Sequence, residues 1–581
     1  MIRESKSTRR KFCSTVAISA IAGSLSPAFA RSKSERAANV VIIGGGLGGC
    51  AAAIAALRNG LKVVMTEATD WIGGQLTSQG VPPDEHRWIE KAGANQSYRE
   101  LRSRIREHYR RHYLLTKAAS NNPLLNPGNG NVSRLCSEPR VSLAVLEKWI
   151  SPFEQSGQLV VLREHFATGA DVDHDLVLAV SVRSAKTGDS QILRGKYFVD
   201  ATELGDLLPM TKTEFVTGSE ARSETNELHA SDTAKPDNQQ AFTMCFAVEH
   251  LPGENHTIDR PNEYAFWRDF VPKLTPPWPG KLLDFTYTHP RSGNPKRLGF
   301  DPRGGKSVDG TLNLWTYRRI IDDSLFKPGR FSSDISLVNW PQNDYVLGNL
   351  VGVSSEEVER HIARAKQLSL SLLYWLQTEA PRPDGGTGFP GLRLRADLMG
   401  TTDGLAKTPY IRESRRIRAQ FTVLEEHVGR EQRAMVVTGK PRADIARAMA
   451  VGGPLANVRA ATFDDSVGVG SYPIDLHPSS GGDNYIDFES LRFQIPLGSL
   501  LPVRMRNLLP ACKNIGSTHI TSGCYRLHPV EWGIGEAAGC LVSFALQKRE
   551  TPRAIRGKKQ WLADFQQFIR KQGVETEWAR V

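Results

Sequence analysis

A glycine-rich turn between an apolar strand and a small-residue helix constrains the fold of this chain more than any other feature. The apolar run Val40–Ile43 predicts a buried strand. Gly44, Gly46 and Gly49 complete a G-x-G-x-x-G pattern, and Cys50–Leu57 is rich in alanine, as a closely packed helix requires. A lone pattern of this kind can be a plain turn before a helix. The complete strand, turn and helix instead predict the start of a βαβ unit in a parallel sheet.

The residues after this helix indicate what the turn would bind. A second apolar segment, Leu61–Met65, leads to Glu67 and Ala68, about 20 residues beyond the turn. The free N–H groups of a helix N-terminus attract a pyrophosphate, and Gly46 and Gly48 let the backbone approach it. A carboxylate at Glu67 would accept hydrogen bonds from an adenosine ribose. The sequence therefore predicts a dinucleotide site at this turn.

The N-terminal residues have the three parts of an export signal. Ser7–Phe12 includes Arg9, Arg10 and Lys11, a short apolar stretch follows, and Ala28–Ala30 offers small residues for cleavage. Residues 1–30 resemble a twin-arginine signal peptide, which implies a periplasmic or otherwise exported protein and the twin-arginine translocase as a partner during export. A disordered basic arm is the alternative. The apolar stretch is too short to span a bilayer, and no later segment is long enough.

The composition bears on the remaining function classes. The 581 residues, 40% hydrophobic and 23% charged, are enough for two or three globular domains. The net charge is +12, but Lys and Arg are dispersed, so we expect a solvated surface and no nucleic-acid partner. No spacing of cysteine or histidine indicates a metal site. Cys50 and Cys540 lie among small residues of predicted helices, where we expect buried free thiols.

Two later motifs point to one family. Gly73-Gly74-Gln75 follows the ribose acid, and here the chain resembles the FAD-dependent oxidoreductases with a glutathione-reductase-like fold, in which this region continues along the cofactor toward the flavin. The segment Asp200-Ala201-Thr202, followed by Glu203-Leu204-Gly205-Asp206, resembles the D-A-T-x-x-G-D motif of that family. The resemblance implies that Gly73, Gly74, Gln75, Asp200, Ala201 and Thr202 lie at the cofactor. A flexible turn and a strand-end turn are the respective alternatives.

The C-terminal part resembles the other half of the same site. Asn507–His519 and Arg526–Cys540 match the family ending N-L-L-x-A-G-x followed by R-x-x-P-x-x-x-x-x-G-x-A-A-G, although Cys512-Lys513 departs from it. The resemblance implies a helix whose N-terminus stabilises the negative charge of the reduced flavin. The cofactor contacts that it implies in this part are Gly516, Glu531, Gly533 and Gly535.

The two matching regions predict the fold class. We expect an α/β protein with a Rossmann-like FAD-binding domain of three-layer ββα architecture, discontinuous over residues 38–210 and 465–550. An inserted α+β substrate region would cover residues 211–464, and a helical tail residues 551–581. Strand-like runs at 159–162, 176–180 and 192–193 are expected to form the small antiparallel meander of this flavoprotein group.

The inserted region gives less information about its ligand. Apolar spacing predicts an amphipathic helix over residues 355–378, a pattern more typical of a core than of a cofactor contact. Five tryptophans there are expected to pack together, with stacking on a sugar or aromatic substrate as the alternative. Ile411–Ile417 is expected to start a basic helix. Its arginines would either form surface ion pairs or meet an anionic substrate or the cofactor pyrophosphate.

The family resemblance implies an enzyme with FAD as its cofactor. We expect an exported FAD-dependent dehydrogenase or oxidase that transfers a hydride from a small-molecule alcohol, sugar or amine to flavin N5. A histidine would take the proton, and His528, His519 and His477 are the candidates in that order, because histidine titrates near neutrality. Each could instead be a structural histidine. The electron acceptor, oxygen or a carrier, stays open.

Two other classes stay open. An NAD(P)H-fed flavin monooxygenase or reductase would need a nicotinamide nucleotide site, but the chain has no second G-x-G-x-x-G pattern. A non-redox protein that keeps the dinucleotide fold for binding is the third interpretation. Bound flavin would distinguish it from the two enzymes.

Overall fold

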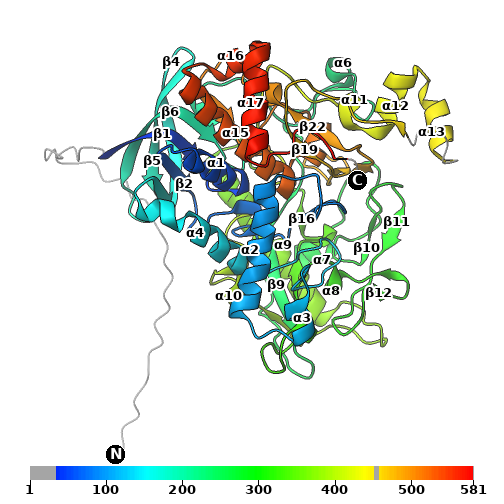
Figure 1. Cartoon of the computed structure of the whole chain (residues 1–581). Coiled ribbons are helices and arrows are strands. Elements are labelled where there is room, and N and C mark those ends of the chain that lie inside the picture. The colour runs from blue at the N-terminus through cyan, green and yellow to red at the C-terminus, as the bar shows by residue number, and fades with distance from the viewer. Residues whose placement is uncertain (1–33, 451–456, 580–581) are drawn as a thin grey trace, which may run out of the picture.

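The nucleotide-binding part is built around a mostly parallel sheet in a computed structural model that describes residues 34–450 and 457–579 (Figure 1). Its parallel strands lie in the spatial order β3, β2, β1, β6 and β23, with helices packed on the sheet. This arrangement is typical of Rossmann-like domains, so the predicted α/β fold class is confirmed. The strand bounds are β1 Ser34–Ile43, β2 Val63–Glu67, β3 Leu159–Arg163, β6 Ser190–Asp200 and β23 Leu508–Pro510.

Strand β23 brings the C-terminal part of the chain back to the first motif. Leu508 pairs with Phe198 and Pro510 with Asp200, so β23 ends where β6 ends. Residues on both sides of the inserted region therefore contribute to one sheet. The domain bounds predicted from the sequence stay predictions.

Two helices, α1 (Leu47–Arg58) and α15 (His528–Lys548), lie side by side above this sheet (Figure 1). A Cβ atom on Gly535 would lie 2.0 Å from the carbonyl oxygen of Gly48, and one on Gly539 would lie 2.3 Å from that of Ala52. The two backbones approach so closely that only glycine fits at these α15 positions. The small-residue pattern of α15 is thus explained by packing against α1.

The antiparallel part of the sheet differs from the prediction in one strand. The meander is formed by β4 (His165–Asp173), β5 (Leu176–Ser184) and β6. The run 159–162 was expected in this meander, but it lies in β3, which pairs in parallel with β2 at the edge of the sheet. That assignment was wrong because β4, with alternating half-buried and exposed residues, has too little apolar periodicity to be recognised.

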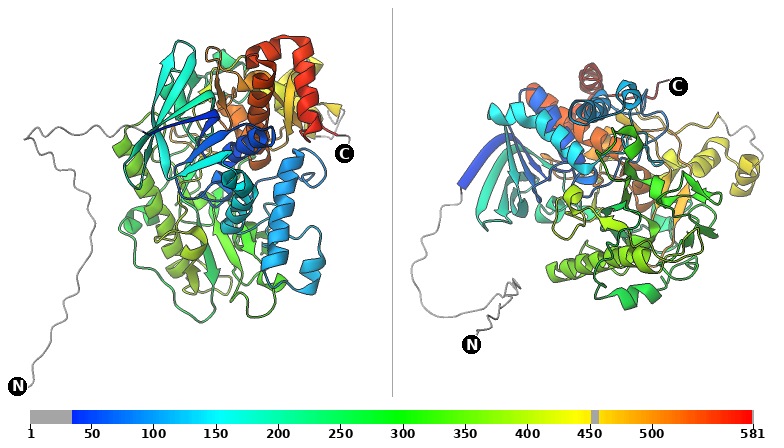
Figure 2. Two further views of the ribbon diagram at one scale, coloured as in Figure 1. Left: turned by 60° about the vertical axis from the view of Figure 1, so that its left-hand side comes forward. Right: turned by 90° about the horizontal axis from the view of Figure 1, so that it is seen from below.

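The inserted region has its own sheet and core. Its sheet has the order β14 (Arg319–Ile321), β15 (Ile335–Val338), β9 (Phe246–His250) and β17 (Leu392–Leu394). Helix α9 covers Ser355–Thr378, as predicted, and the Ser354 hydroxyl caps its N-terminus. Figure 2 shows this region against one side of the nucleotide-binding part. The five tryptophans pack in its core, as expected: Trp267, Trp278, Trp315, Trp340 and Trp375.

The segment Ile411–Ile417 contradicts the prediction of a basic helix. It is extended, and β18 (Arg416–Ile417) pairs with β7 (Phe215–Val216). Arg412 is 2% exposed and Arg416 is 0% exposed, so for these two arginines the surface ion pairs, one of the two alternatives, are wrong. The physical reason is that buried carboxylates form ion pairs with these guanidinium groups, so their charges are balanced without hydration by solvent.

The C-terminal tail is helical, and the cysteines form no disulfide among the described residues. The tail contains α16 (Pro552–Gly557) and α17 (Lys559–Lys571). The six cysteines in the described part of the chain are free and buried.

Within residues 34–450 and 457–579, no helix combines the length and the apolar character that crossing a membrane would take. The predicted signal peptide, residues 1–30, lies outside the described residues.

Candidate cofactor and active site

The glycine turn forms a close cradle at the N-terminus of α1. Gly44 has a φ angle of 100°, in the left-handed region that favours glycine. A Cβ atom on Gly49 would lie 2.2 Å from the Gly44 carbonyl oxygen, so helix and strand touch here. Gly46 precedes the helix without any side-chain cap, and the first turn has no acidic residue. In the first turn the Gly48 N–H meets the Glu531 carboxylate at 3.4 Å, and the positive end of the helix dipole favours an anion at this place.

Glu67 lies beside this turn at the end of β2. Its Oε2 atom accepts a hydrogen bond from the backbone N of Gly45 at 3.1 Å, and Oε1 accepts two from Thr69. The residue is 7% exposed, and burial raises the pKa of its carboxyl to about 7. A carboxyl at this place suits the ribose hydroxyls of a dinucleotide. Ala68 follows at an exposed position.

Gly73, Gly74 and Gln75 lie on the other side of the cradle. The backbone N of Gly73 donates to the Gly45 carbonyl at 2.7 Å, and both glycines have positive φ angles. The Gln75 amide donates to Glu531 at 2.5 Å and to the Arg526 carbonyl at 3.0 Å. Its Oε1 atom is buried and finds no hydrogen-bond partner within the part of the chain that the structure describes. Gln75 therefore links the first motif to the C-terminal one.

Glu531 joins the two halves from the first turn of α15. Its Oε1 atom accepts from the backbone N of Gly48 at 3.4 Å, and its Oε2 atom lies 3.7 Å from Nζ of Lys513. Burial raises the pKa of the Glu531 carboxyl, while Lys513 opposes that shift. Gly535, one turn later, packs closely against Gly48, as described above. The structure thus brings Glu531 and Gly535 to the predicted cradle.

The carboxylate of Glu203 lies over the cradle. A Cβ atom on Gly46 would lie 3.0 Å from Oε1 of Glu203, and one on Gly74 would lie 2.8 Å from it. That oxygen is buried and has no hydrogen-bond partner in residues 34–450 and 457–579, while Oε2 accepts a hydrogen bond from Lys513. Burial lowers the pKa of Lys513, but Glu203 and Glu531 outweigh it and raise that pKa overall. An anionic group therefore already lies where the helix N-terminus favours one.

Asp200, Ala201 and Thr202 form the turn after β6. The Asp200 carboxylate accepts hydrogen bonds from the backbone N and hydroxyl of Thr202 and from the backbone N of Leu207. Burial raises the Asp200 pKa to about 7. The backbone N of Ala201 donates to Ile43, and a Cβ atom on Gly44 would lie 2.3 Å from the Ala201 carbonyl oxygen. The motif is at the cradle, where Asp200 and Thr202 shape the turn.

Two predicted contacts lie apart from these residues. The backbone N of Gly516 donates to Ser499, and a Cβ atom on Gly516 would meet Ala419 at 2.4 Å. A Cβ atom on Gly533 would lie 3.7 Å from Ile495 and 3.9 Å from Asn95. Packing therefore requires glycine at position 516, whereas Gly533 has room for a Cβ atom, and the cofactor contacts predicted for both glycines stay predictions.

The remaining cradle residues fit a dinucleotide. The N-terminus of α1 and the close glycine contacts form a site that favours an anion, and a buried carboxyl lies at the place expected for the ribose. Two buried acceptors, Gln75 Oε1 and Glu203 Oε1, lack hydrogen-bond partners among the described residues. Lys513 supplies a buried cation on the same side. These residues would hold the adenosine and pyrophosphate of such a group.

His528, the first candidate base, is buried at the start of α15. Its Nδ1 atom accepts a hydrogen bond from the backbone N of Asp84 at 3.1 Å. Burial lowers its pKa to about 4. The imidazole is therefore neutral and weakly basic at neutral pH. These surroundings favour a structural role for His528, as a hydrogen-bonded polar group at the N-terminus of α15.

His519, the second candidate, belongs to a buried ion network. Its Nδ1 atom lies 2.8 Å from Oε1 of Glu413, which also pairs with Arg416 at 2.6 Å. Burial lowers the His519 pKa, but Glu413 outweighs it and the net shift is upward. The buried carboxylate favours the protonated imidazole, which suits a structural ion pair better than a base.

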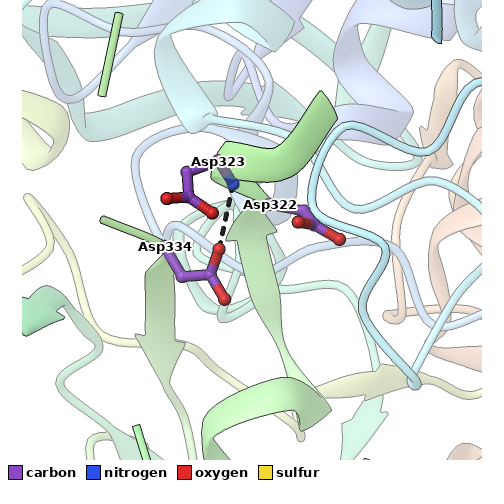
Figure 3. Close-up of side chains that lie close together, drawn as sticks. All are labelled: Asp322, Asp323 and Asp334. Atoms are coloured by element: carbon purple, nitrogen blue, oxygen red, sulfur yellow. Dashed lines mark hydrogen bonds between the residues drawn. The ribbon is translucent and has the colours of Figure 1, made fainter. Parts of the chain in front are cut away.

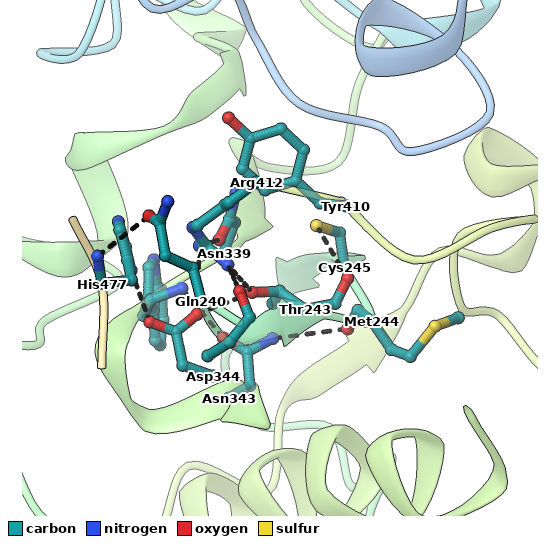
Figure 4. Close-up of polar contacts among 12 residues, drawn as sticks. Gln240, Thr243, Met244, Cys245, Asn339, Asn343, Asp344, Tyr410, Arg412 and His477 are labelled. Carbon is teal, nitrogen blue, oxygen red and sulfur yellow. Dashed lines mark hydrogen bonds and ion pairs between the residues drawn. The ribbon is translucent and has the colours of Figure 1, made fainter. Parts of the chain in front are cut away.

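His477 is partly accessible and is oriented by a carboxylate (Figure 4). Its Nδ1 atom lies 2.6 Å from Oδ2 of Asp344, and its side chain is 19% exposed. Asp344 also pairs with Arg412 at 3.0 Å and accepts from the Thr243 hydroxyl at 2.7 Å. Burial would raise the Asp344 pKa, but Arg412 and His477 lower it overall, so this carboxylate is ionised. An Nδ1–H bond to Asp344 leaves Nε2 as the basic atom.

The structure connects His477 to the cradle through a residue not proposed from the sequence as functional. Arg526 lies 3.3 Å from Oδ2 of Asp475, which lies 3.6 Å from Nε2 of His477. Arg526 also donates to the Tyr410 hydroxyl at 3.1 Å. The R-x-x-P motif contained Arg526, but no local signal identified its partners Asp475 and Tyr410, which lie far apart in the sequence.

Three carboxylates gather elsewhere, on the inserted region (Figure 3). Asp322, Asp323 and Asp334 have oxygens within 4.8 Å of one another. Arg319 pairs with Asp322 at 2.7 Å and with Asp334 at 2.5 Å, so a guanidinium already balances this charge. Burial and the neighbouring Asp334 raise the Asp323 pKa to about 6. We assign no metal to this cluster.

The doubly wound sheet, the glycine cradle and the buried ribose acid define a dinucleotide-binding α/β protein. The family model for FAD dependent oxidoreductases matches residues 39–569, and the chain belongs to that family. It is therefore an FAD-dependent oxidoreductase, and its cofactor is FAD. The cradle described above would hold the adenosine and pyrophosphate of this cofactor.

Solved structures give only a general likeness. A geranylgeranyl bacteriochlorophyll reductase-like protein from Thermoplasma acidophilum is 10% identical, with 93% of this chain and 85% of that chain covered and a TM-score of 0.30. L-proline dehydrogenase from P. horikoshii is 15% identical, with 32% and 24% covered and a TM-score of 0.17. The myxobacterial halogenase CndH is 12% identical, with 38% and 45% covered and a TM-score of 0.21.

These comparisons do not identify a substrate. The chain spans less than half the length of the first five solved structures that it matches. The comparison with curated proteins finds no match. The reaction must therefore be argued from the residues of this chain.

Proposed function

We propose that this enzyme oxidises an organic alcohol, sugar or amine and is exported to do so. The observation that carries the proposal is the His477–Asp344 pair, a histidine oriented by an ionised carboxylate at 2.6 Å. FAD, when bound, supplies the acceptor for a hydride at N5. The residues of the chain would position the substrate and take up its proton.

The connection between the two parts of the site supports this proposal. Arg526 accepts a hydrogen bond from Gln75 through its carbonyl, on the cradle side. Its guanidinium reaches Asp475, beside His477, on the side of the inserted region. One residue thus spans the distance between the cofactor cradle and the histidine pair. A substrate held between them would direct its reacting carbon toward the cofactor side and its acidic proton toward His477.

His477 is the residue that we propose as the base. A C–H bond and an O–H or N–H bond of the substrate break, and a C=O or C=N double bond forms. FAD, when bound, would take the hydride with both electrons, and Nε2 of His477 would take the proton. Asp344 stabilises the resulting imidazolium through Nδ1–H, and Arg412 keeps Asp344 ionised. We therefore rank His477 ahead of His528 and His519 as the candidate base.

Anaerobic mixing of the FAD-loaded protein with alcohols, sugars and amines tests the proposal. We expect at least one class to bleach the flavin, and His477→Ala to slow that bleaching. Rapid bleaching by NADPH and none by any organic substrate would favour the NAD(P)H-fed monooxygenase or reductase instead. A folded protein that takes up no FAD would contradict both.

Export is the second part of the proposal, and it rests on the sequence alone. Arg9 and Arg10 lead a short apolar stretch and small residues suited to cleavage. Replacing both with lysine should leave the protein inside the cell, whereas the wild type should appear in the exported fraction with its N-terminus removed. Equal distribution of the two proteins would contradict twin-arginine export.

A further inference from the structure

A buried guanidinium with two unsatisfied nitrogen donors lies beside the proposed site. Arg318 is 8% exposed, and its Nε and Nη1 atoms have no hydrogen-bond partner among the described residues. Nη1 lies 3.2 Å from Oδ1 of Asp84, which also lacks a hydrogen-bond partner there. A buried charge has lost its hydration, so unsatisfied donors cost free energy unless something binds to them. The pair therefore points to a ligand.

The location of this pair connects it to the site. The backbone N of Asp84 donates to His528, the first residue of α15, whose Glu531 reaches the cradle. Arg526 donates to the Tyr410 hydroxyl at 3.1 Å, and the Arg412 guanidinium lies 4.9 Å from the centroid of that ring. Burial raises the pKa of the Tyr410 phenol, and the charges of Arg526, Asp84, Arg412 and Arg318 also act on that pKa. Arg318 thus lies among the groups that connect the cradle to the His477 pair.

Neighbouring polar groups are also unsatisfied. The backbone N of Leu337 donates to the Arg318 carbonyl, and Asn339 follows two residues later. Several buried donors around Tyr410 have no hydrogen-bond partner in the described part of the chain: Gln79 Nε2, Asn339 Nδ2, Arg412 Nε and Arg526 Nε. So many unused donors in a region of buried charge are unusual for a closed protein core. They suit a polar ligand with several acceptor oxygens.

We infer that Arg318 binds a carboxylate of the substrate, and that Asp84 accepts a hydrogen bond from one of its hydroxyl groups. The substrate class is then a hydroxy acid. This inference deepens the proposed function and rests on it, because the bound acid is the molecule that the flavin would oxidise.

The chemistry favours a carboxylate over a phosphate. The planar guanidinium fork matches the two oxygens of a carboxylate. Asp84, Asp475 and Asp344 lie in the same charged region and would repel a dianion more strongly than a monoanion. Asp84 balances the charge of Arg318 and leaves an acceptor oxygen for a neutral hydroxyl.

Binding of matched probes to the FAD-loaded protein tests this inference. Gluconate carries a carboxylate and hydroxyl groups, sorbitol carries only hydroxyl groups, and acetate carries only a carboxylate. We expect gluconate to bind most tightly, detected as a saturable change in flavin absorbance and as a rise in melting temperature. Arg318→Met should weaken gluconate binding about 10-fold or more and leave sorbitol binding unchanged.

Two further variants keep the test independent of folding defects. Arg318→Lys keeps the charge but loses the fork, so we expect intermediate affinity. Arg382→Gln, at an exposed pair with Asp384, is the matched control and should bind gluconate as the wild type does. Equal binding of gluconate and sorbitol by the wild type would overturn the inference without any variant.

Other outcomes separate the inference from the proposed function. If Arg318→Met changes only the reduction potential of the flavin and not gluconate binding, Arg318 serves the cofactor and the inference is wrong. If neutral sugars bleach the flavin while no acid binds, the proposed function stands and the inference fails. If the protein binds no FAD, the proposed function fails, and the melting temperature still reports whether gluconate binds.

Discussion

Nδ1 of His477 lies 2.6 Å from Oδ2 of Asp344, although the two residues come from distant parts of the chain. Asp344 belongs to β16 (Asp344–Tyr345) of the inserted region, and His477 follows β20 (Ile474–Leu476) of the returning segment. The pair therefore forms only when the inserted region and the returning segment fold together. A base built in this way is oriented before a substrate arrives.

Replacing His477 should slow flavin reduction without releasing the cofactor. His477→Ala removes the proposed base, so we expect the rate of anaerobic flavin reduction to fall about 10²- to 10⁴-fold. The flavin content should stay near that of the wild type, because His477 makes no contact with the cradle residues described here. His174→Ala, whose side chain is 92% exposed, is the control. An unchanged rate in His477→Ala, together with a large loss in His528→Ala or His519→Ala, would reassign the base.

The contact between α1 and α15 should tolerate no side chain. Gly535→Ala would place a Cβ atom 2.0 Å from the Gly48 carbonyl oxygen, so we expect a loss of about 3 kcal/mol in the free energy of unfolding or no folded protein. Gly533→Ala, two residues earlier on the same helix, would meet its nearest atom at 3.7 Å. It should be neutral or slightly stabilising, because alanine favours a helix. Denaturant unfolding compares the two, and equal stability would contradict the packing described here.

Glu227 should make the stability of the protein depend on pH. Its Oε1 atom accepts from the Thr518 hydroxyl at 2.6 Å, and burial raises its pKa from 4.5 to about 8. The folded state binds this proton more tightly than the unfolded state does. The contribution is therefore complete below pH 4.5 and lost as the pH rises toward 8.

The variant Glu227→Gln removes that titration. Between pH 5 and about 8 its free energy of unfolding should fall less than that of the wild type, by a difference on the order of 4 kcal/mol at most. Urea unfolding at several pH values measures the difference. Glu100→Gln, at an exposed pair with Arg104, should follow the wild type. Parallel curves for Glu227→Gln and the wild type would refute the raised pKa.

Glu203 should weaken the binding of FAD. Its carboxylate lies over the N-terminus of α1, where the pyrophosphate is expected, and holds Lys513. Glu203→Gln removes that negative charge and frees Lys513, so we expect several-fold tighter FAD binding to the apoprotein. Titration with FAD measures it, with Glu214→Gln at the surface pair with Arg504 as the control. Weaker binding by Glu203→Gln would show that the carboxylate supports the cofactor instead.

Much of the fold could be predicted because its signals are local. The glycine turn, the helix Ser355–Thr378 and the small residues of α15 each follow from spacing within one segment. Strand β4 could not be recognised, because its residues alternate without a strong apolar face. Ile411–Ile417 was misread as a helix because its arginines are neutralised by carboxylates that the local sequence does not show.

The candidate site shows the same division. The residues of the cradle follow from motifs, and the structure brings most of them together around Gly46. The role of a histidine depends on its partners, and these come from elsewhere: Asp344 for His477, Glu413 for His519 and the backbone of Asp84 for His528. No sequence pattern could rank three histidines whose partners are set only by the tertiary fold.

The most direct test of the account is the absorbance spectrum of the purified protein, recorded before and after anaerobic addition of organic substrates. The account predicts a folded protein that carries FAD and whose flavin bands are bleached by an alcohol, a sugar, an amine or a hydroxy acid. A folded, colourless protein that takes up no FAD when it is supplied would contradict it.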